Sequence, residues 1–202
     1  MSELNLLYGV VIGYLLGSIP GALFIDKVFY HTDIREYGSG NLGGSNAGRV
    51  LGKKAAIAVI AIDIGKVVLA VALCSLFDQE ASIWAGLAAA FGHCYPLFAN
   101  FKGGKAVATM FGFLLSTSIF TFRDGLFVIV PLVVFLIVLY LGKMVSLASI
   151  FASLTSTLYI AIAQDNLSIT IASCLLTVLI IYRHRANIGR IANGTENKVS
   201  WL

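Results

Sequence analysis

Seven long apolar stretches follow one another along this chain and constrain its fold more than any other feature. A membrane-spanning helix needs about 17 to 25 mostly apolar residues. Only 12% of the 202 residues are charged, whereas soluble domains carry about 25% and could not bury so much apolar surface. We therefore predict an all-α polytopic membrane protein with seven transmembrane helices, or five if two short stretches are re-entrant or tilted. The stretches are residues 4–25, 55–77, 81–98, 106–120, 126–141, 145–163 and 167–182.

These stretches run along the whole chain, so we predict that residues 1–202 form a single integral-membrane domain. Ser2, Glu3 and Asn5 stand at or just before the start of the first stretch, where a cleavable signal peptide would carry positive charge, and this stretch is predicted to be a retained helix. The cysteines lack the spacing of a disulfide framework or a zinc site. We interpret them as small packing residues: Cys74, Cys94 and Cys174.

The basic residues predict an orientation, because Lys and Arg collect in cytoplasmic loops. With the stretches threaded alternately, twelve of the fourteen basic residues fall on one face, Arg123 alone falls on the other and Lys66 lies within a helix. We predict a multi-pass protein of the cell (plasma) membrane. Its N-terminus is expected outside the cell, its C-terminus in the cytoplasm and its active site on the cytoplasmic face. The net charge of +4 then reflects orientation and an anion site, and nothing indicates nucleic acid. The twelve are Lys27, Arg35, Arg49, Lys53, Lys54, Lys102, Lys105, Lys143, Arg183, Arg185, Arg190 and Lys198.

The first inner loop, residues 37–49, contains five glycines. Glycine lets a backbone turn several amides towards one point, and such a concavity binds anions. The alternative is a flexible linker that ends in a helix start. Donors that could add to an anion site are the side chains of Ser39, Asn41, Ser45 and Arg49.

The second inner loop, residues 92–105, ends in Gly103-Gly104-Lys105 directly before an apolar stretch. A helix N-terminus favours negative charge through its free amides and its dipole, so this arrangement resembles a phosphate cradle. It is not a P-loop, because the spacing and the Ser or Thr after the lysine are missing. The alternative is a basic anchor at the cytoplasmic face.

Two further segments carry polar groups on the same predicted face. Ser146 begins an apolar stretch, where a serine by default caps the helix. Residues 183–190 continue the last helix beyond the membrane, and His184 and Asn187 share one of its faces. The alternative for this segment is a basic collar whose side chains snorkel to the interface.

A few other polar residues need an interpretation. Asp63 and Lys66 lie one turn apart inside an apolar stretch, and we expect them to pair inside the protein, as a strut or as a wall of a polar site. His31 is followed five residues later by Glu36; this superficially resembles a soluble-type acyltransferase signature, but a solvated loop histidine is the better account. For His93 an interfacial hydrogen bond and a ligand role remain open. No His, Cys and carboxylate cluster predicts a metal.

Four motifs, in order along essentially the whole chain, resemble the bacterial acyl-phosphate-dependent glycerol-3-phosphate acyltransferases. The departures from that family are small: Leu42 stands where proline is frequent, Gly44-Ser45 replaces an Ala-Thr pair, and Ala106 replaces a glycine. These could alter loop stiffness and substrate affinity. The matching residues are Gly38 to Asn41 with Gly43, Asn46 and Arg49; Gly92, His93, Pro96, residues 101–105 and 107–109; residues 145–147; and Arg183 to Arg185, Asn187, Ile188, Arg190 and residues 194–198.

The resemblance implies transfer of a fatty acyl group from acyl phosphate to the 1-hydroxyl of glycerol 3-phosphate. The products would be lysophosphatidic acid and phosphate, in the first step of phospholipid synthesis, with no cofactor or metal. The expected partners are the two substrates, the lipid bilayer and an upstream enzyme that produces acyl phosphate.

The site predicted for this reaction is a cationic phosphate clamp. Arg49 and Lys105 would neutralise charge, and Ser39 and Ser146 would orient oxygens. The residues predicted to be catalytic are Ser39, Arg49, Lys105, Ser146, His184 and Asn187, with His184 and Asn187 holding the acceptor or the acyl carbonyl. Further substrate contacts are expected from Gly38, Gly40, Asn41, Gly43, Asn46, Lys102, Gly103, Gly104, Arg183 and Arg185.

The sequence offers no convincing Ser-His-Asp or His-carboxylate pair for base catalysis. Phosphate is a good leaving group with a second pKa of about 6, so a substrate-assisted mechanism is favoured, with the protein supplying orientation and charge stabilisation. The alternative functions are an organophosphate or anion transporter and a lipid-binding scaffold. A transporter would usually show paired repeats with broken helices near the midplane, and no internal repeat is evident.

Overall fold

The computed structural model describes residues 2–199, and within this range the chain is helical without a strand, which confirms the all-α prediction. Short π-helical turns follow α2 (Asp26–Tyr30) and α6 (Ser118–Phe122), and 3-10 turns cover Ile34–Glu36 and Leu97–Ala99. The α-helices are α1 (Glu3–Gly17), α2 (Gly21–Ile25), α3 (Gly44–Val50), α4 (Lys53–Ser75), α5 (Gln79–Cys94), α6 (Val107–Thr117), α7 (Leu126–Gly142), α8 (Val145–Ala163), α9 (Leu167–Arg183) and α10 (Arg185–Ala192).

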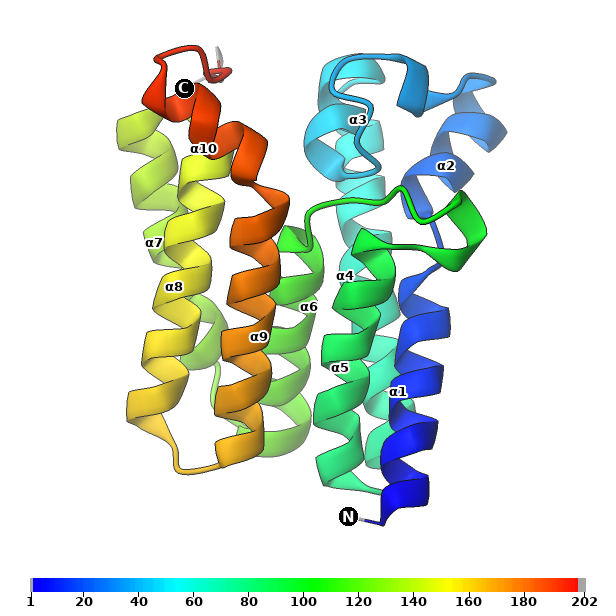
Figure 1. Cartoon of the computed structure of the whole chain (residues 1–202), viewed down its shortest axis with the longest axis vertical. Helices are drawn as coiled ribbons and strands as arrows, with labels where there is room; N and C mark the ends of the chain where they lie inside the picture. Colours follow the sequence, from blue (N-terminus) through cyan, green and yellow to red (C-terminus); the bar gives the residue numbers. More distant parts are fainter. Residues whose placement is uncertain (1, 200–202) are drawn as a thin grey trace.

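The long helices form two neighbouring groups (Figure 1), α1, α4 and α5 on one side and α7, α8 and α9 on the other, with α6 between them. The short helices α2, α3 and α10 gather at one end, the upper end in Figure 1, and the connection from α5 to α6 crosses between the two groups. The two termini lie at opposite ends. We call the upper end the loop end.

The three glycines of α1 explain how the first group packs. Gly9, Gly13 and Gly17 follow one another at four-residue intervals and are buried. A Cβ at these positions would lie 2.6, 2.1 and 2.1 Å from backbone carbonyl oxygens of α5. Close backbone approach through such small-residue faces is a typical way to hold helices together in lipid, where no hydrophobic force draws them together. The α1 sequence therefore fixes the position of α5 and of the loop that follows it.

All seven apolar stretches are helical over most of their length, but fewer of them are long enough to cross a bilayer on their own. By length and composition, the described residues contain three candidate spans (Glu3–Tyr30, Lys53–Ser75 and Val145–Ala163), and a fourth if α9 and α10 are taken as one bent span. The 16 residues of α5 extend about 24 Å, less than the roughly 30 Å hydrocarbon core. The seven crossings, the fallback of five and the orientation stay predictions.

Two predicted helix boundaries are wrong. The stretch 4–25 is not one helix, because α1 ends at Gly17 and a second helix begins after Pro20; proline lacks the amide that would continue the ladder. The C-terminal segment does not continue α9 straight, since α10 is bent from it by 57° at His184.

The predicted pairing of Asp63 and Lys66 is confirmed, with Lys66 Nζ 2.8 Å from Asp63 Oδ1 and both side chains buried. Cys74 and Cys94 are buried packing residues as predicted, whereas Cys174 is exposed on α9.

Candidate functional site

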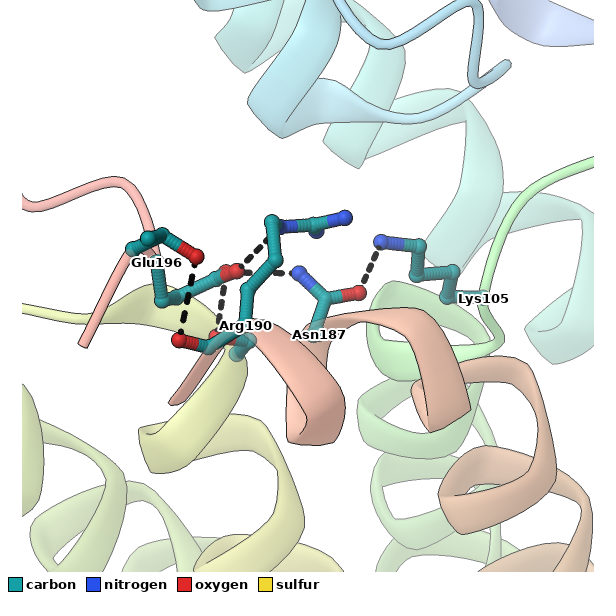
Figure 2. Close-up of polar contacts among 6 residues, drawn as sticks. Lys105, Asn187, Arg190 and Glu196 are labelled. Atoms are coloured by element: carbon teal, nitrogen blue, oxygen red, sulfur yellow. Dashed lines mark hydrogen bonds and ion pairs between the residues drawn. The ribbon is translucent and has the colours of Figure 1, made fainter. Parts of the chain in front are cut away.

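One carboxylate, that of Glu196, whose side chain is 6% exposed, organises the C-terminal side of the loop end (Figure 2). Its Oε1 accepts hydrogen bonds from Ser146 Oγ at 2.7 Å and Asn187 Nδ2 at 2.6 Å, and its Oε2 accepts one from Arg190 Nε at 2.7 Å. Burial by itself raises the pKa of Glu196, but these three donors bring its pKa below the ordinary value. The carboxylate is therefore ionised and already engaged by three protein donors.

Lys105 extends this set of contacts towards the centre of the loop end. Its Nζ donates to Asn187 Oδ1 at 2.6 Å, so Asn187 bridges the lysine and the carboxylate. Burial and then the positive charges of Arg190, Arg183 and Arg49 lower the pKa of Lys105. We call Lys105, Ser146, Asn187, Arg190 and Glu196 the Glu196 network. It brings three predicted site residues from separate segments together, and its positive charges outnumber its carboxylates.

Ser146 does not cap a helix, which was the default alternative to its predicted role in the site. The cap position of α8 is Met144, without a side-chain cap bond, and Ser146 lies inside the first turn. Its hydroxyl donates to Glu196 instead. This contact joins the start of α8 to the segment that follows α10.

Gly103 and Gly104 do not present their amides to an anion, contrary to the predicted phosphate cradle. Their N–H groups donate to the carbonyls of Cys94 and His93 at the end of α5, at 3.2 and 3.0 Å. On the other side, Arg183 donates to the carbonyls of Gly103 and Gly104 at 2.9 and 3.0 Å. Arg183 therefore holds the turn. Its positive charge still acts on Lys105.

The free amides beside Lys105 belong to the first turn of α6. Its cap residue Ala106 adopts a left-handed conformation with φ of 61° and makes no side-chain cap bond. The first amides of a helix have no intrahelical partner and carry the positive end of the dipole. Thr109 Oγ1, in the same turn, is buried without a hydrogen-bond partner among the described residues. Together with Lys105, this helix start can accept an anion.

His184 lies at the bend between α9 and α10 and is buried. Its Nδ1 lies 2.8 Å from the carbonyl of Ile180. Since a carbonyl only accepts, Nδ1 carries the proton and Nε2 remains a hydrogen-bond acceptor. Burial, reinforced by the positive charge of Lys105, lowers the pKa of His184 to about 4. The imidazole is therefore neutral at physiological pH and adds no charge to the site.

On the opposite side of the loop end, the glycine-rich loop is folded around Asn46. Asn46 donates to the carbonyls of Ile34 and Tyr37, both at 3.2 Å, and accepts the amide of Ser39 at 2.9 Å. Gly38 has a φ of 62°, and a Cβ there would lie 2.4 Å from Asn46 Oδ1. Asn46 and Gly38 therefore shape the loop, and their predicted contacts with substrate stay predictions.

The polar groups that this loop leaves available are few. The Ser39 and Arg49 side chains are exposed and make no hydrogen bond to another described residue. Asn41 Oδ1 is buried without a partner in the described part of the chain. Gly40 has a φ of 67°, and the Gly43 carbonyl accepts the amides of Asn46 and Ala47 at the start of α3.

Some predicted substrate contacts make no hydrogen bond to the Glu196 network in the described part of the chain. Lys102 lines a small polar pocket of about 360 Å³ together with Arg35, Glu36 and Asn100. Arg185 donates to the Tyr182 carbonyl at 3.1 Å, and its guanidinium lies 4.4 Å from the Tyr182 ring centroid. This is the geometry of the basic collar that the sequence left open. His31 and Glu36 are both exposed and no hydrogen bond between them is found in the described structure.

Sequence reasoning did not assign site roles to Glu196 and Arg190. One signal could have found the carboxylate, because Glu196 is the single acidic residue after Asp165 and follows a run of cations. A lone carboxylate among so many donors is expected to pair with several of them.

The chain is similar to known proteins both in sequence and in structure. A family model described as "Glycerol-3-phosphate acyltransferase" matches residues 7–194. A glycerol-3-phosphate acyltransferase of Geobacillus kaustophilus is 48% identical over 193 residues, which cover 95% of each chain. One of Bacillus subtilis is 47% identical over 194 residues, covering 96% of this chain and 97% of the relative.

Two crystal structures resemble this fold over 96% of the chain. Both are of PlsY, an integral membrane glycerol 3-phosphate acyltransferase. Its glycerol 3-phosphate form superposes with a TM-score of 0.89 at 34% identity, and its lysophosphatidic acid form with a TM-score of 0.85 at 33% identity. The matched regions cover 96% and 95% of the two PlsY chains.

Proposed function

The chain belongs to the glycerol-3-phosphate acyltransferase family, and from this premise we propose that it transfers an acyl group from acyl phosphate to the 1-hydroxyl of glycerol 3-phosphate. The products are lysophosphatidic acid and phosphate. The observation that carries the proposal is the surplus of positive charge at the loop end. The positive charges of Arg190, Arg183 and Arg49 all act there on Lys105, while the carboxylate of Glu196 is already engaged.

This surplus fits substrates that both carry phosphate. Lys105 and the first-turn amides of α6 form a place where phosphate oxygens gain charge-assisted hydrogen bonds, which are roughly twice as strong as neutral ones. Arg49 lies exposed on α3 and can offer its planar fork to a second phosphate or to the other side of the first. The apolar flanks of the helices suit a long acyl chain.

The transfer step needs no protein nucleophile. The 1-hydroxyl oxygen attacks the acyl carbonyl carbon, the bond from that carbon to the phosphate oxygen breaks, and the hydroxyl proton passes to the departing phosphate. A phosphate with a second pKa of about 6 can take this proton near neutral pH. The protein contributes alignment and stabilisation of the developing negative charge.

His184 fits an orienting role better than a proton-transfer role. A pKa of about 4 makes its imidazole a weak base. Its Nε2 can accept a hydrogen bond from the 1-hydroxyl of glycerol 3-phosphate and so orient that group. Asn187, Ser146 and Glu196 fix the segments around it through their mutual hydrogen bonds.

We place the active site at the cytoplasmic face of the plasma membrane, with seven crossings and the N-terminus outside. A cysteine-labelling experiment tests this placement in intact cells. The exposed native Cys174 is first replaced by serine, and single cysteines are then introduced at the exposed positions Ser39 and Asp165. An impermeant thiol reagent should label Asp165→Cys and spare Ser39→Cys until the membrane is opened. The reverse pattern would overturn the orientation.

The activity is tested by phosphate release from acyl phosphate with the purified protein. Release should require glycerol 3-phosphate, should be matched by lysophosphatidic acid formation and should survive a metal chelator. Acyl-CoA should not replace acyl phosphate. Release at the same rate without glycerol 3-phosphate, use of acyl-CoA or loss of activity in chelator would contradict the proposal. Uptake of labelled glycerol 3-phosphate into proteoliposomes without product would instead support a transporter.

A further inference from the structure

A cluster of three charged or titratable side chains lies buried beneath the turn that carries Lys105. Lys66 Nζ is 2.8 Å from Asp63 Oδ1, and His93 Nδ1 is 3.0 Å from Lys66 Nζ and 3.2 Å from Asp63 Oδ1. All three side chains are at most 6% exposed. Two come from α4 and one from the end of α5.

A strut between two apolar helices does not require charge. Each charged side chain costs roughly 2.5 to 3.5 kcal/mol at the centre of a membrane helix on insertion scales, and apolar residues of similar volume often replace a buried ion pair without loss of stability. Apolar contacts would serve a strut equally well. The ion pair alone therefore does not explain why these residues are charged, and the contacts of the cluster with its surroundings are the better guide to its role.

The cluster touches the Lys105 turn through His93. A Cβ on Gly104 would lie 2.0 Å from His93 Nε2, and the Gly104 amide donates to the His93 carbonyl at 3.0 Å. The imidazole ring thus packs directly against Gly104, the residue before Lys105. Arg183 holds the carbonyls of the same turn from the other side.

The cluster also reaches the break in the first apolar stretch. Lys66 Nζ donates to the carbonyl of Ile19 at 3.0 Å, in the segment where α1 ends before Pro20. One ammonium group therefore connects α4, the α1–α2 break and, through His93, the turn at the loop end.

We infer that Asp63, Lys66 and His93 are positioning residues, which hold the Gly103–Gly104 turn and thereby set the position of Lys105 for the phosphate of the acceptor. This inference rests on the proposed function for its kinetic consequence, but its structural part can be measured without activity. None of the three residues needs to touch a substrate.

The first test replaces the ion pair by apolar residues of similar size, in the double variant Asp63→Val and Lys66→Met. We expect the KM for glycerol 3-phosphate to rise at least fivefold while kcat stays within about threefold. In hydrogen-exchange measurements on the purified protein, amides of residues 99–106 should exchange at least tenfold faster. The matched control is Thr157→Val, which removes a hydroxyl bonded to Ser173 and Thr177 between α8 and α9 and should change neither quantity.

The second test uses the two glycines and does not depend on removing the ion pair. Gly104→Ala should raise the KM for glycerol 3-phosphate because its methyl group meets atoms of the His93 ring, and His93→Asn should relieve that clash. In the double variant Gly104→Ala and His93→Asn, at least half of the increase in the logarithm of KM should be reversed. Gly103→Ala meets the His93 backbone carbonyl at 2.0 Å, so the same His93→Asn change should not rescue it.

The outcomes separate this inference from the proposed function. If the wild-type protein transfers acyl groups and the ion-pair variant alters neither KM nor exchange, the inference is wrong and the function stands. Equal rescue of both glycine variants would also overturn it. If the wild-type protein does not act on glycerol 3-phosphate, the function fails, and faster exchange of residues 99–106 in the variant still supports the positioning role.

Discussion

On the C-terminal side of the site, Ser146, Asn187 and Arg190 all donate to Glu196. On the α3 side, the Ser39 hydroxyl and the Arg49 guanidinium make no hydrogen bond within the described structure. The first side is organised before any ligand binds, because a buried carboxylate fixes its donors. The second side offers donors on a loop whose backbone is fixed by Asn46 and whose side chains are free to turn towards a ligand.

This difference suggests a division of work between the two sides. Pre-organised groups stabilise charge without reorganisation during the reaction, which is the main source of electrostatic catalysis. Mobile exposed groups must be ordered by the ligand, and that ordering offsets part of their binding energy. Substitutions on the C-terminal side should therefore cost more activity than those on the α3 side.

The largest effect is expected from Lys105→Met. This change removes the cation at the start of α6 and leaves Asn187 Oδ1 without its donor. We expect kcat/KM for glycerol 3-phosphate to fall by about a hundredfold or more, the range of a lost oxyanion donor. Lys54→Met, which removes an exposed cation at the start of α4, is the control and should change kcat/KM less than threefold. Similar values for both variants would place the site elsewhere.

A smaller loss is expected from Arg49→Lys. The substitution keeps the charge but removes the bidentate fork, so kcat/KM should fall by about tenfold, and Arg49→Ala should fall somewhat further. Because the side chain is exposed, the melting temperature of both variants should match the wild type. Full activity of the lysine variant would show that Arg49 acts only through its charge. A loss larger than that of Lys105→Met would reverse the comparison between the two sides.

The helices were well predicted from the sequence, because a long apolar stretch between polar loops indicates a segment that lies in lipid, and such a segment must be helical to satisfy its backbone hydrogen bonds. The break before Pro20 was missed, because the long apolar runs on both sides of residues 18–20 make the stretch look continuous. The pairing of Asp63 with Lys66 was predictable because both lie one turn apart on a single helix. Their contact with His93 was not, since it depends on how α4 and α5 pack.

For the site, the sequence identified donors but could not show which of them the protein itself occupies. The amides of Gly103 and Gly104 and the guanidinium of Arg183 are used in holding the turn. The side-chain amide of Asn46 is of the kind that contacts ligands, but it is used in hydrogen bonds to the backbone of its own loop. These assignments depend on contacts between residues far apart in the chain, and no local pattern encodes them.

A third prediction concerns the stability of the pre-organised side at acid pH. The pKa of His184 is about 4 in the folded protein, below the ordinary value of about 6.5. The unfolded chain therefore binds more protons between these values, and stability falls as pH is lowered from about 6.5 towards 4. The wild-type melting temperature should drop by several degrees over this range, and His184→Asn should drop less. Parallel curves for the two proteins would contradict the buried neutral histidine.

The smallest effect is expected from Arg185→Ala, although Arg185 is a neighbour of Arg183 in sequence and carries the same charge. Arg183 donates to both glycine carbonyls of the Lys105 turn, whereas Arg185 lies over the Tyr182 ring on the exposed face of α10. Exposed contacts of this kind contribute about 0.5 to 1 kcal/mol at most, and they do not reach the Glu196 network. We expect Arg185→Ala to change kcat/KM less than twofold, while Arg183→Ala loosens the turn and lowers it by about tenfold. Steady-state assays of both variants at equal ionic strength measure the difference. If the two losses are equal, long-range charge and not the Arg183 hydrogen bonds determines the affinity of the site, and pre-organisation would no longer distinguish its two sides.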